Sequence, residues 1–235
     1  DVPRAEALWR LTQAAREKRL DMAKARFCFL NDETGELTDG AAICPTDVLE
    51  GGALLAAQCQ SGTYEPMVWQ CVYRRAFLLE NGLRMAEGLL FEDELFQAPA
   101  LIRAKRAAAF DAVILEYRQR PGSIMASFAG SARWCASYAQ VCARLDALAR
   151  TLPSGAARAA LQRRVGQIAL NVGKNIPAYR LPPTVAGEAM AFLKAHRWEL
   201  ARYALKSGDA AIAAQGALLL LSPKLFVGMY RRVMP

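Results

Sequence analysis

The stretch LLFEDELF, residues 89–96, sets two adjacent carboxylates, Glu92 and Asp93, in a run that is otherwise mostly apolar. A charge among apolar side chains is costly unless another group pairs with it or a function uses it. Neighbouring helical positions point about 100° apart, so the two carboxylates cannot converge on one atom. An acidic pair is also typical of the first turn of a helix, where backbone N–H groups and the helix dipole favour carboxylates. The pair is therefore either a plain helix start or a site in which one acid acts and the other supports it.

Around this pair, the periodicity of residues 1–120 predicts a mixed α/β arrangement. Apolar side chains at helical spacing alternate with short runs of β-branched and aromatic residues, and turn residues separate them. In the helix that follows the acids, Leu95, Phe96, Pro99 and Ile102 share one predicted face. The predicted helices are 4–19, 47–60, a short helix ending near Gly82, and 92–105; the predicted strands are 23–30 and 107–118, with hairpin turn residues at 31–40.

After Ser127 the chain is helical in pattern. One apolar stripe recurs at steps of four and three from Trp134 to Leu148, and another from Leu161 to Val172. A third predicted helix, about 185–206, carries His196 on its apolar side, and we interpret this histidine as structural because no other metal ligand lies near it. The sequence thus predicts two parts, which are residues 1–126 (α/β) and residues 127–235 (helical).

Charge is spread unevenly along the chain, whose formal net charge is +8. Residues 1–100 carry 10 Lys and Arg against 16 Asp and Glu, whereas residues 101–180 carry 13 against 3 and residues 181–235 carry 7 against 3. A basic region of this kind is typical of contact with polyanions such as nucleic acid, anionic lipid or phosphorylated ligands. Nucleic acid is the least favoured of these, because the cations are scattered over several helices and no reading motif is present.

The six cysteines show no CxxC pair, and the chain has one histidine. Such irregular spacing excludes a zinc knuckle and a small disulfide scaffold. It indicates reduced, mostly buried thiols, as in a cytoplasmic protein. No segment has the pattern of a signal peptide.

The C-terminal tail is strongly apolar from Ala210, but Gln215 and Ser222-Pro223-Lys224 interrupt it. The apolar stretch is shorter than the ~20 clean residues that a membrane-spanning helix needs. Two alternatives stay open: a helix buried on its own domain, or a helix in the membrane interface with Lys224, Arg231 and Arg232 toward lipid headgroups.

The acidic pair belongs to an ordered set of short motifs over roughly residues 60–128. The set consists of Val68-Trp69, Tyr73-Arg74-Arg75, Phe77-Leu78, Glu80-Asn81-Gly82-Leu83, Glu87-Gly88, Glu92-Asp93-Glu94, Phe96 and the run from Tyr117 to Ile124. This order resembles the C-terminal half of family 2 glycosyltransferases, in particular bacterial enzymes of capsular polysaccharide, exopolysaccharide or lipopolysaccharide synthesis. The resemblance implies part of a GT-A type, Rossmann-like α/β domain, followed by an α-helical C-terminal region. It also implies inverting transfer of a sugar from a nucleotide-sugar donor to a hydroxyl of a glycan or lipid-linked acceptor.

By this resemblance, Asp93 is the general base that accepts the proton of the acceptor hydroxyl, and Glu92 orients the backbone or the acceptor. The apolar surroundings would then exclude water from the reacting oxygen. The candidates for binding the leaving diphosphate are Arg118, Arg120 and, with a weaker signal, Ser123. The candidates for stacking on a sugar ring are Trp69 and Tyr73, at positions i and i+4. Each has a structural alternative: a solvated basic edge for the arginines, the start of the following helix or loop for Ser123, and core packing for the aromatic pair.

The chain departs from the resembled family at its beginning. No nucleotide-binding strands and no complete Asp-x-Asp metal motif precede Val2-Pro3, so we expect Asp1 to be the last aspartate of that motif and the donor-binding half to lie outside this sequence. The resemblance implies a divalent metal, Mn or Mg, in the complete enzyme, with Asp1 as one ligand. Phe91 stands where many relatives carry a histidine, which puts any supporting role of that side chain in doubt.

Two hypotheses follow. The first is a cytoplasmic glycosyltransferase of cell-envelope polysaccharide synthesis, positioned peripherally on the inner face of the cytoplasmic membrane. The second is a non-catalytic basic helical module that binds an anionic membrane, a partner protein or nucleic acid. Salt-dependent nucleic-acid binding or vesicle binding without transfer would favour the second.

Overall fold

The chain forms two compact units, each of which is described by itself. The computed structural model describes residues 1–40, 42–120, 131–178 and 182–233. The units are Asp1–Glu87 with Glu92–Ser123 (unit 1), and Gly88–Phe91 with Ile124–Pro235 (unit 2). The predicted boundary between residues 126 and 127 lies outside the described residues, and the short segment Gly88–Phe91 groups with the helical unit by its contacts.

Unit 1 is built on a five-stranded sheet in which β1, β5, β2 and β3 are successive neighbours and β4 also pairs with β2. Strands β2 and β5 run parallel, and the three short strands pair with them in antiparallel direction. The strands predicted at 23–30 and 107–118 and the hairpin at 31–40 are confirmed. The bounds are β1 Val2–Pro3, β2 Met22–Asn31, β3 Leu37–Asp39, β4 Cys71–Tyr73 and β5 Ala107–Gln119.

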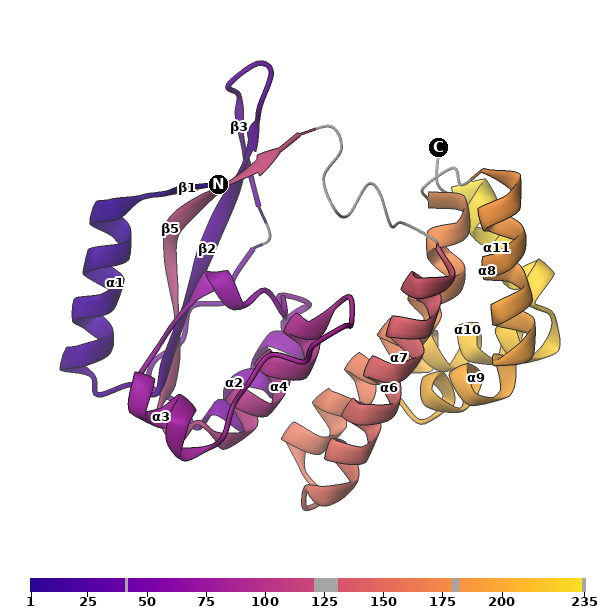
Figure 1. The fold of residues 1–235 in the computed structure, drawn as a ribbon. Helices are drawn as coiled ribbons and strands as arrows, with labels where there is room; N and C mark the ends of the chain where they lie inside the picture. Colours follow the sequence, from indigo (N-terminus) through magenta and orange to yellow (C-terminus); the bar gives the residue numbers. More distant parts are fainter. Residues whose placement is uncertain (41, 121–130, 179–181, 234–235) are drawn as a thin grey trace. The chain divides into compact units, whose positions relative to one another are not determined.

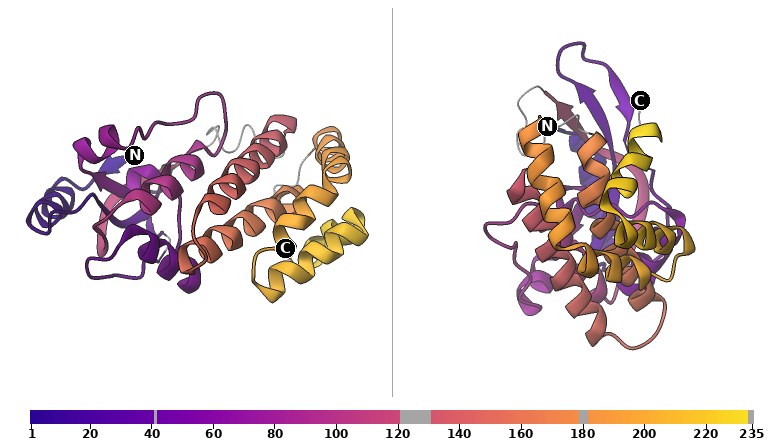
Figure 2. Two further views of the ribbon diagram at one scale, coloured as in Figure 1. Left: turned by 90° about the horizontal axis from the view of Figure 1, so that it is seen from below. Right: turned by 90° about the vertical axis from the view of Figure 1, so that its right-hand side faces the viewer.

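Helices cover both faces of this sheet. In Figure 1, α1 lies on one side of the sheet, and α2 and α4 lie on the other. The view from below in Figure 2 shows the same order of layers. The bounds are α1 Ala5–Glu17, α2 Gly51–Ser61, the 3-10 helix η1 Val68–Gln70, α3 Arg75–Glu80 and α4 Glu92–Arg103.

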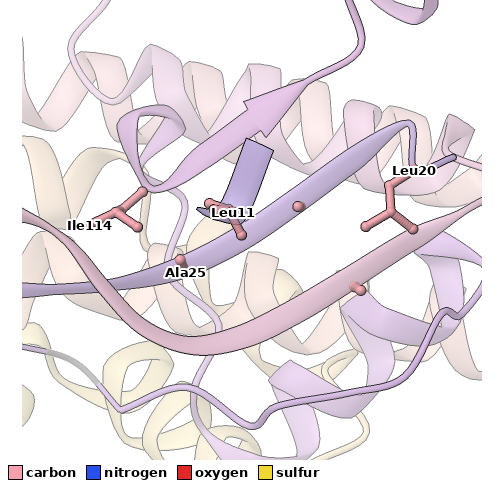
Figure 3. Packing of buried hydrophobic residues seen from close by; sticks show 6 residues of the cluster. Leu11, Leu20, Ala25 and Ile114 are labelled. Carbon is pink, nitrogen blue, oxygen red and sulfur yellow. The ribbon is translucent and has the colours of Figure 1, made fainter. Parts of the chain in front are cut away.

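The period-2 alternation of β2 divides its side chains between the two faces. Ala23 and Ala25 belong to a buried cluster on the α1 side, together with Leu11, Leu20 and Ile114 (Figure 3). The alternate residues Met22 and Lys24 point to the other face, and each is only 1% exposed. A buried lysine in the central strand already sets the face that carries α4 apart from an ordinary core. The residues of the α1-side cluster are Leu11, Leu20, Ala23, Ala25, Ala108 and Ile114.

One prediction for unit 1 is wrong in detail. The helix predicted from residue 47 begins at Gly51, because Thr46 and Leu49 hydrogen-bond to the edge of β5 instead. Trp69 and Tyr73, which are four residues apart, lie in different elements: η1 carries the first and β4 the second.

The predicted apolar face of α4 is also wrong. Phe96 is buried, but Leu95, Pro99 and Ile102 are only partly buried. The buried face instead includes Gln97 and Leu101, which are both 0% exposed. The physical reason is a set of hydrogen-bonding groups on β4, which makes a polar side chain the better partner on this face of the helix.

From residue 131 onward, the described residues of unit 2 form helices joined by short turns, and the helical class is as predicted. The residues of the two apolar stripes are buried, apart from Leu148, which is partly buried. The helix predicted over 185–206 is wrong, because it breaks at His196, which is half-exposed and stacks on Phe192 with ring centroids 4.2 Å apart. The bounds are α6 Ala132–Thr151, α7 Ala156–Ala178, α8 Pro183–Ala195, α9 Arg197–Leu205, α10 Ala210–Leu221 and α11 Pro223–Val233.

Within the described parts of the chain, no helix is both long and apolar enough to cross a membrane. All six cysteines are free thiols, and four of them are buried, as the sequence predicts.

Asp21, at the start of β2, joins three segments of unit 1. Its carboxylate accepts hydrogen bonds from Nη2 of Arg74 (2.8 Å) and from the backbone N–H groups of Lys105 (2.8 Å) and Arg106 (3.2 Å). Burial alone would raise the pKa of Asp21, but these bonds outweigh it and hold the pKa below its ordinary value. The carboxylate therefore stabilises the fold above its unfolded pKa, and this contribution is lost as the pH falls through the lowered pKa.

We expect Asp21→Asn to reduce the free energy of unfolding at pH 7 by about 2 kcal/mol, since hydrogen bonds to charged groups contribute about 1.5–3 kcal/mol. Urea denaturation measures this change. Asp47→Asn is the matched control, because Asp47 is exposed, and we expect it to change stability by less than about 0.5 kcal/mol. Equal stabilities of the two variants at pH 7 would contradict the assignment.

Candidate functional site

The candidate site extends along strands β2 and β5. Tyr73 and Cys71 pair with the amino end of β2, whereas Trp69, Arg118 and Asp1 lie toward the carboxyl ends of the two strands. Ligands of open α/β sheets bind at this end of the strands. A continuous series of contacts joins four of the predicted site residues here. It runs from Asp93 through the backbone of Val68 to Trp69, from there to Tyr117, and along β5 to Arg118 and Asp1.

Asp93 is in the first turn of α4, which begins at Glu92, and its side chain is half-buried. Burial raises the pKa of Asp93 to about 6, the neighbouring charges of Glu92 and Glu94 add to this, and a hydrogen bond from the backbone N–H of Val68 partly offsets it. Among the described residues, no lysine or arginine forms an ion pair with this carboxylate. An acid of this kind is ionised at neutral pH and still basic enough to accept a proton, which is what a general base requires.

Trp69 is held by aromatic neighbours. Its ring stacks on Tyr117 (centroids 5.3 Å apart, 23° between planes) and meets the edge of Phe27 at 5.0 Å. Since Tyr117 covers one face of the indole, only the opposite face could stack on a sugar. The half-buried tryptophan therefore combines the two roles that the sequence left open, core packing and a possible sugar platform.

Tyr73 lies in a buried polar network beneath Asp93. Its hydroxyl donates to Oε1 of Gln97 (2.5 Å), and Nε2 of Gln97 donates to Sγ of Cys71 (3.2 Å). Burial raises the pKa of both the Tyr73 hydroxyl and the Cys71 thiol, and the charge of Asp93 raises them further. Both groups therefore stay protonated, and Tyr73 is fixed by Gln97 and by an edge contact with Phe96 at 5.6 Å. This tyrosine supports α4 and is not placed to stack on a sugar.

Lys24, in β2, is a further buried polar residue next to this network. Its Nζ donates to the backbone oxygen of Glu65 at 2.5 Å and lies 5.3 Å from the ring centre of Tyr64. The charge of Lys24 acts on the Cys71 thiol, lowering its pKa, although burial has the larger and opposite effect. The lysine therefore brings a positive charge into the same buried layer as the acids of α4.

Arg118 and Asp1 meet where β1 pairs with the end of β5. The backbone N–H of Arg118 donates to Oδ1 of Asp1 at 3.1 Å, and the guanidinium of Arg118 forms an ion pair with Asp32. Arg120 follows the end of β5 and is exposed, and Ser123 lies outside the described residues. The structure thus brings together Asp1 and Arg118, with Arg118 already sharing its charge with Asp32.

A divalent metal does not find a complete set of ligands in the described residues, where no group of three His, Cys, Asp or Glu side chains comes together. Asp1 supplies one carboxylate, and one of its two oxygens already accepts the Arg118 N–H. Divalent Mg or Mn prefers several oxygen ligands, so these residues by themselves do not fit a metal site.

Phe91, directly before the acidic pair, belongs to unit 2. Its ring stacks on Tyr138 (centroids 4.0 Å apart, 14° between planes) and meets Trp134 edge-on at 5.0 Å. The backbone of Phe91 has φ of +63°, a strained value for a bulky residue, and Leu90 donates its N–H to Oγ of Ser137 at 3.2 Å. The helical unit therefore holds the residue that immediately precedes Glu92, and an aromatic ring is what this packing requires at position 91.

Several residues of the site were not indicated by the sequence. Gln97 could have been found from its spacing, because it is four residues after Asp93 and so shares a helix face with it. Cys71 could have been found by strand alternation, because it is two residues before Tyr73 and so shares a strand face with it. Lys24 gave no local signal, since its neighbours are distant in sequence.

Comparison with known proteins gives a fold and no family. No protein-family model matches the sequence, and no curated protein matches it. Among solved structures, two crystal structures of S. aureus TarS 1–349 are similar. The structure in complex with UDP-GlcNAc has a TM-score of 0.60 and 16% identity, and the match covers 97% of this chain and 62% of that one. The second has a TM-score of 0.59 and 13% identity, over 99% of this chain and 62% of that one.

The chain therefore spans about three fifths of the length of these neighbours, 62% in both cases. At such low identity the likeness concerns the fold alone. The chain has a mixed α/β fold that resembles the fold of S. aureus TarS, and the mixed α/β class is the one that the sequence predicts.

Proposed function

We propose that this chain is part of a glycosyltransferase that moves a sugar from a nucleotide-sugar donor to a hydroxyl of a glycan or lipid-linked acceptor, with inversion at the anomeric carbon. The observation that carries the proposal is Asp93. It is a half-buried carboxylate with a raised pKa, in a fold similar to that of a protein crystallised with UDP-GlcNAc.

In the proposed reaction, the acceptor oxygen attacks the anomeric carbon while Asp93 accepts its proton, and the bond to the nucleoside diphosphate breaks. Burial and, after it, the neighbouring charges of Glu92 and Glu94 raise the pKa of Asp93, so the carboxylate is a stronger base than an ordinary aspartate. The N–H of Val68 fixes the orientation of the carboxylate. The buried bonds of Gln97 to Tyr73 and Cys71 hold α4, and with it Asp93, against the sheet.

Fewer residues are proposed to bind the nucleotide-sugar donor. In this proposal the face of Trp69 opposite Tyr117 stacks on a sugar ring, and Arg120 and Arg118 carry the cations that a leaving diphosphate needs. A divalent metal, Mn or Mg, remains a proposal for the complete enzyme, in which Asp1 would give one oxygen ligand and other ligands would come from outside the described residues.

We further propose that the enzyme acts in bacterial cell-envelope polysaccharide synthesis, on the cytoplasmic side of the membrane. The exposed side chains of Leu221, Lys224 and Leu225 at the junction of α10 and α11 support contact with a membrane interface, since they combine apolar surface with a cation.

The direct test is an assay of nucleoside diphosphate release from a panel of nucleotide-sugars. It uses both this chain and the longest protein that contains it, with acceptor glycans present and absent. Acceptor-dependent release with one donor supports the proposal. Failure of every donor and acceptor in the longest protein, together with an unchanged melting temperature in the presence of uridine diphosphate and manganese, would refute it.

Glu92→Gln tests the electrostatic part of the mechanism through the pH profile. With Asp93 as base, kcat/KM falls as the pH drops through about 6, the pKa of this carboxyl. Removing the charge of Glu92 lowers the pKa of Asp93, so we expect the acid limb of the profile to move to lower pH. An acid limb at the same pH in Glu92→Gln and wild type would show that a group other than Asp93 determines the fall of kcat/KM. Glu87→Gln is the matched control, since Glu87 is an exposed neighbour and does not contribute to the shift of Asp93.

A further inference from the structure

A groove lies in unit 1, between the C-terminal turn of α1 and strand β4. Its volume is about 660 Å³. Ala15, Leu20 and Val72 contribute apolar lining. The size is within the range of about 300–1,000 Å³ that is usual for small-molecule sites and far too small for a folded partner.

Four arginines line the same groove: Arg16, Arg19, Arg74 and Arg75. The acidic lining residue is Asp21, and its carboxylate is already engaged by Arg74 and by two backbone N–H groups. In the described part of the chain, Arg16, Arg19 and Arg75 are exposed and form no ion pair. The groove therefore offers three guanidinium groups beside an apolar floor.

Arg19 occupies a position at which glycine is usual. It follows the C-cap of α1 with φ of +49°, and the turn is closed by the bonds Arg19 N–H to Arg16 O (3.0 Å) and Leu20 N–H to Ala15 O (2.8 Å). A left-handed conformation costs an L-residue about 1–2 kcal/mol and is usually taken by glycine at a helix end. An arginine retained at such a position suggests a use for its side chain.

The groove shares Tyr73 with the network beneath Asp93, but it is separate from the residues proposed to bind the donor. It is at the amino end of β2, beside Leu20 and Asp21, whereas Arg118, Asp32 and Trp69 lie toward the carboxyl end. β2 has 10 residues. At about 3.3 Å per residue, such a strand separates its two ends by roughly 30 Å. The diphosphate of a donor at the candidate site could not reach these arginines.

We propose that this groove binds a phosphate group carried on an organic molecule with an apolar part. Guanidinium groups donate paired N–H bonds to phosphate oxygens, and Arg16, Arg19 and Arg75 present such donors together. The apolar floor takes the carbon portion of the ligand. This chemistry is available from two sources, a phospholipid headgroup at a membrane surface or a soluble organic phosphate.

The experiment compares two double variants of the 235-residue chain in two binding assays. Arg16→Gln with Arg75→Gln removes two groove cations, and Arg10→Gln with Arg84→Gln removes two exposed cations outside the groove. The first assay is titration with hexyl phosphate, and the second is sedimentation with phosphatidylcholine vesicles that contain phosphatidic acid. Melting temperatures show that each variant is folded.

We expect the groove variant to weaken binding by at least about tenfold and the control by less than about twofold, because each lost charge-assisted bond has a large effect on affinity. Weakening in both assays identifies a soluble organic phosphate as a sufficient ligand. Weakening with vesicles alone identifies a lipid headgroup. Equal binding by the two variants, or no binding of either probe by the wild-type chain, overturns the proposal.

Arg19→Gly provides an independent readout. Glycine relieves the left-handed strain, so this variant should melt at a higher temperature than wild type while it binds the same probe more weakly. Higher stability with unchanged affinity would also refute the proposal. No sugar transfer is measured, so the outcome does not depend on the proposed enzymatic activity.

Discussion

Asp93→Asn is expected to lower the rate of sugar transfer by about 10³-fold, within the range of about 10²–10⁴ that a general base contributes. The amide keeps the size of the side chain, and its oxygen can still accept the hydrogen bond from Val68. It cannot accept the proton of the acceptor hydroxyl. Binding of donor and acceptor should change little, so the loss should appear in kcat and not in KM.

The same variant should make the fold more stable at pH 8. The folded pKa of Asp93 is about 6, above the ordinary value of 3.8, so its negative charge destabilises the folded state at high pH. This destabilisation is fully present above about pH 6 and disappears as the pH falls toward 4, where the wild-type carboxyl is protonated as well. Melting temperatures at pH 8 and pH 4 should therefore show a gain for Asp93→Asn at pH 8 that vanishes at pH 4.

Asp47→Asn is the control for both measurements, since it removes an exposed carboxylate of unit 1. Wild-type turnover in Asp93→Asn would remove Asp93 from the mechanism. Lower stability at pH 8 would show instead that the carboxylate is a helix-start residue that stabilises α4, which is the alternative that the sequence alone left open.

Gly51→Ala should reduce the free energy of unfolding of unit 1 by about 3 kcal/mol, at the upper end of the usual cost of overpacking. Gly51 begins α2 at its contact with the last turn of α4. A Cβ atom there would be 2.0 Å from the backbone oxygen of Leu101 and 2.9 Å from Cβ of Ala104. Neither neighbour is the end of a flexible side chain, so one helix must move. Because α4 carries Asp93 and Gln97, we also expect activity to fall.

Gly187→Ala is the matched control, because Gly187 lies in α8 and nothing is within 4 Å of the position of its added Cβ. An alanine in a helix interior is favoured over glycine by up to about 1 kcal/mol, so this variant should be as stable as wild type or more stable. Urea denaturation compares the two. A Gly51→Ala protein as stable as wild type would show that the contact between α2 and α4 can relax.

The acidic pair shows which features of the site the local sequence pattern predicts. Spacing and composition place Glu92 and Asp93 at a helix start, and the structure confirms that α4 begins there. The like charges of Glu92 and Glu94 are local, but the burial that raises the pKa of Asp93 most, and the opposing hydrogen bond from Val68 of η1, depend on tertiary packing that no periodicity records. Tyr73 shows the reverse: its residue type fits a sugar platform, but pairing of β4 with β2 turns it toward Gln97.

The predicted start of α2 was wrong for the same reason, which is a tertiary contact. Thr46 is a good N-cap by type, yet the edge of β5 takes its hydroxyl, and the helix starts later at Gly51. Likewise, the apolar stripe predicted over 185–206 continues through His196, although the backbone breaks there. Local preferences of about 1 kcal/mol give way when a tertiary contact supplies a competing hydrogen bond.

By itself, the sequence determined the α/β and helical classes of the two parts, the strands 23–30 and 107–118, and the acids that start α4, because hydrophobic period and helix-start chemistry are local. Only the tertiary structure decided which side chains surround Asp93, that Phe91 is held by the helical unit, and that Arg16, Arg19 and Arg75 share one groove. The physical reason is that burial, charge interaction and cavity shape depend on residues distant in sequence, and strand pairing brings those residues together.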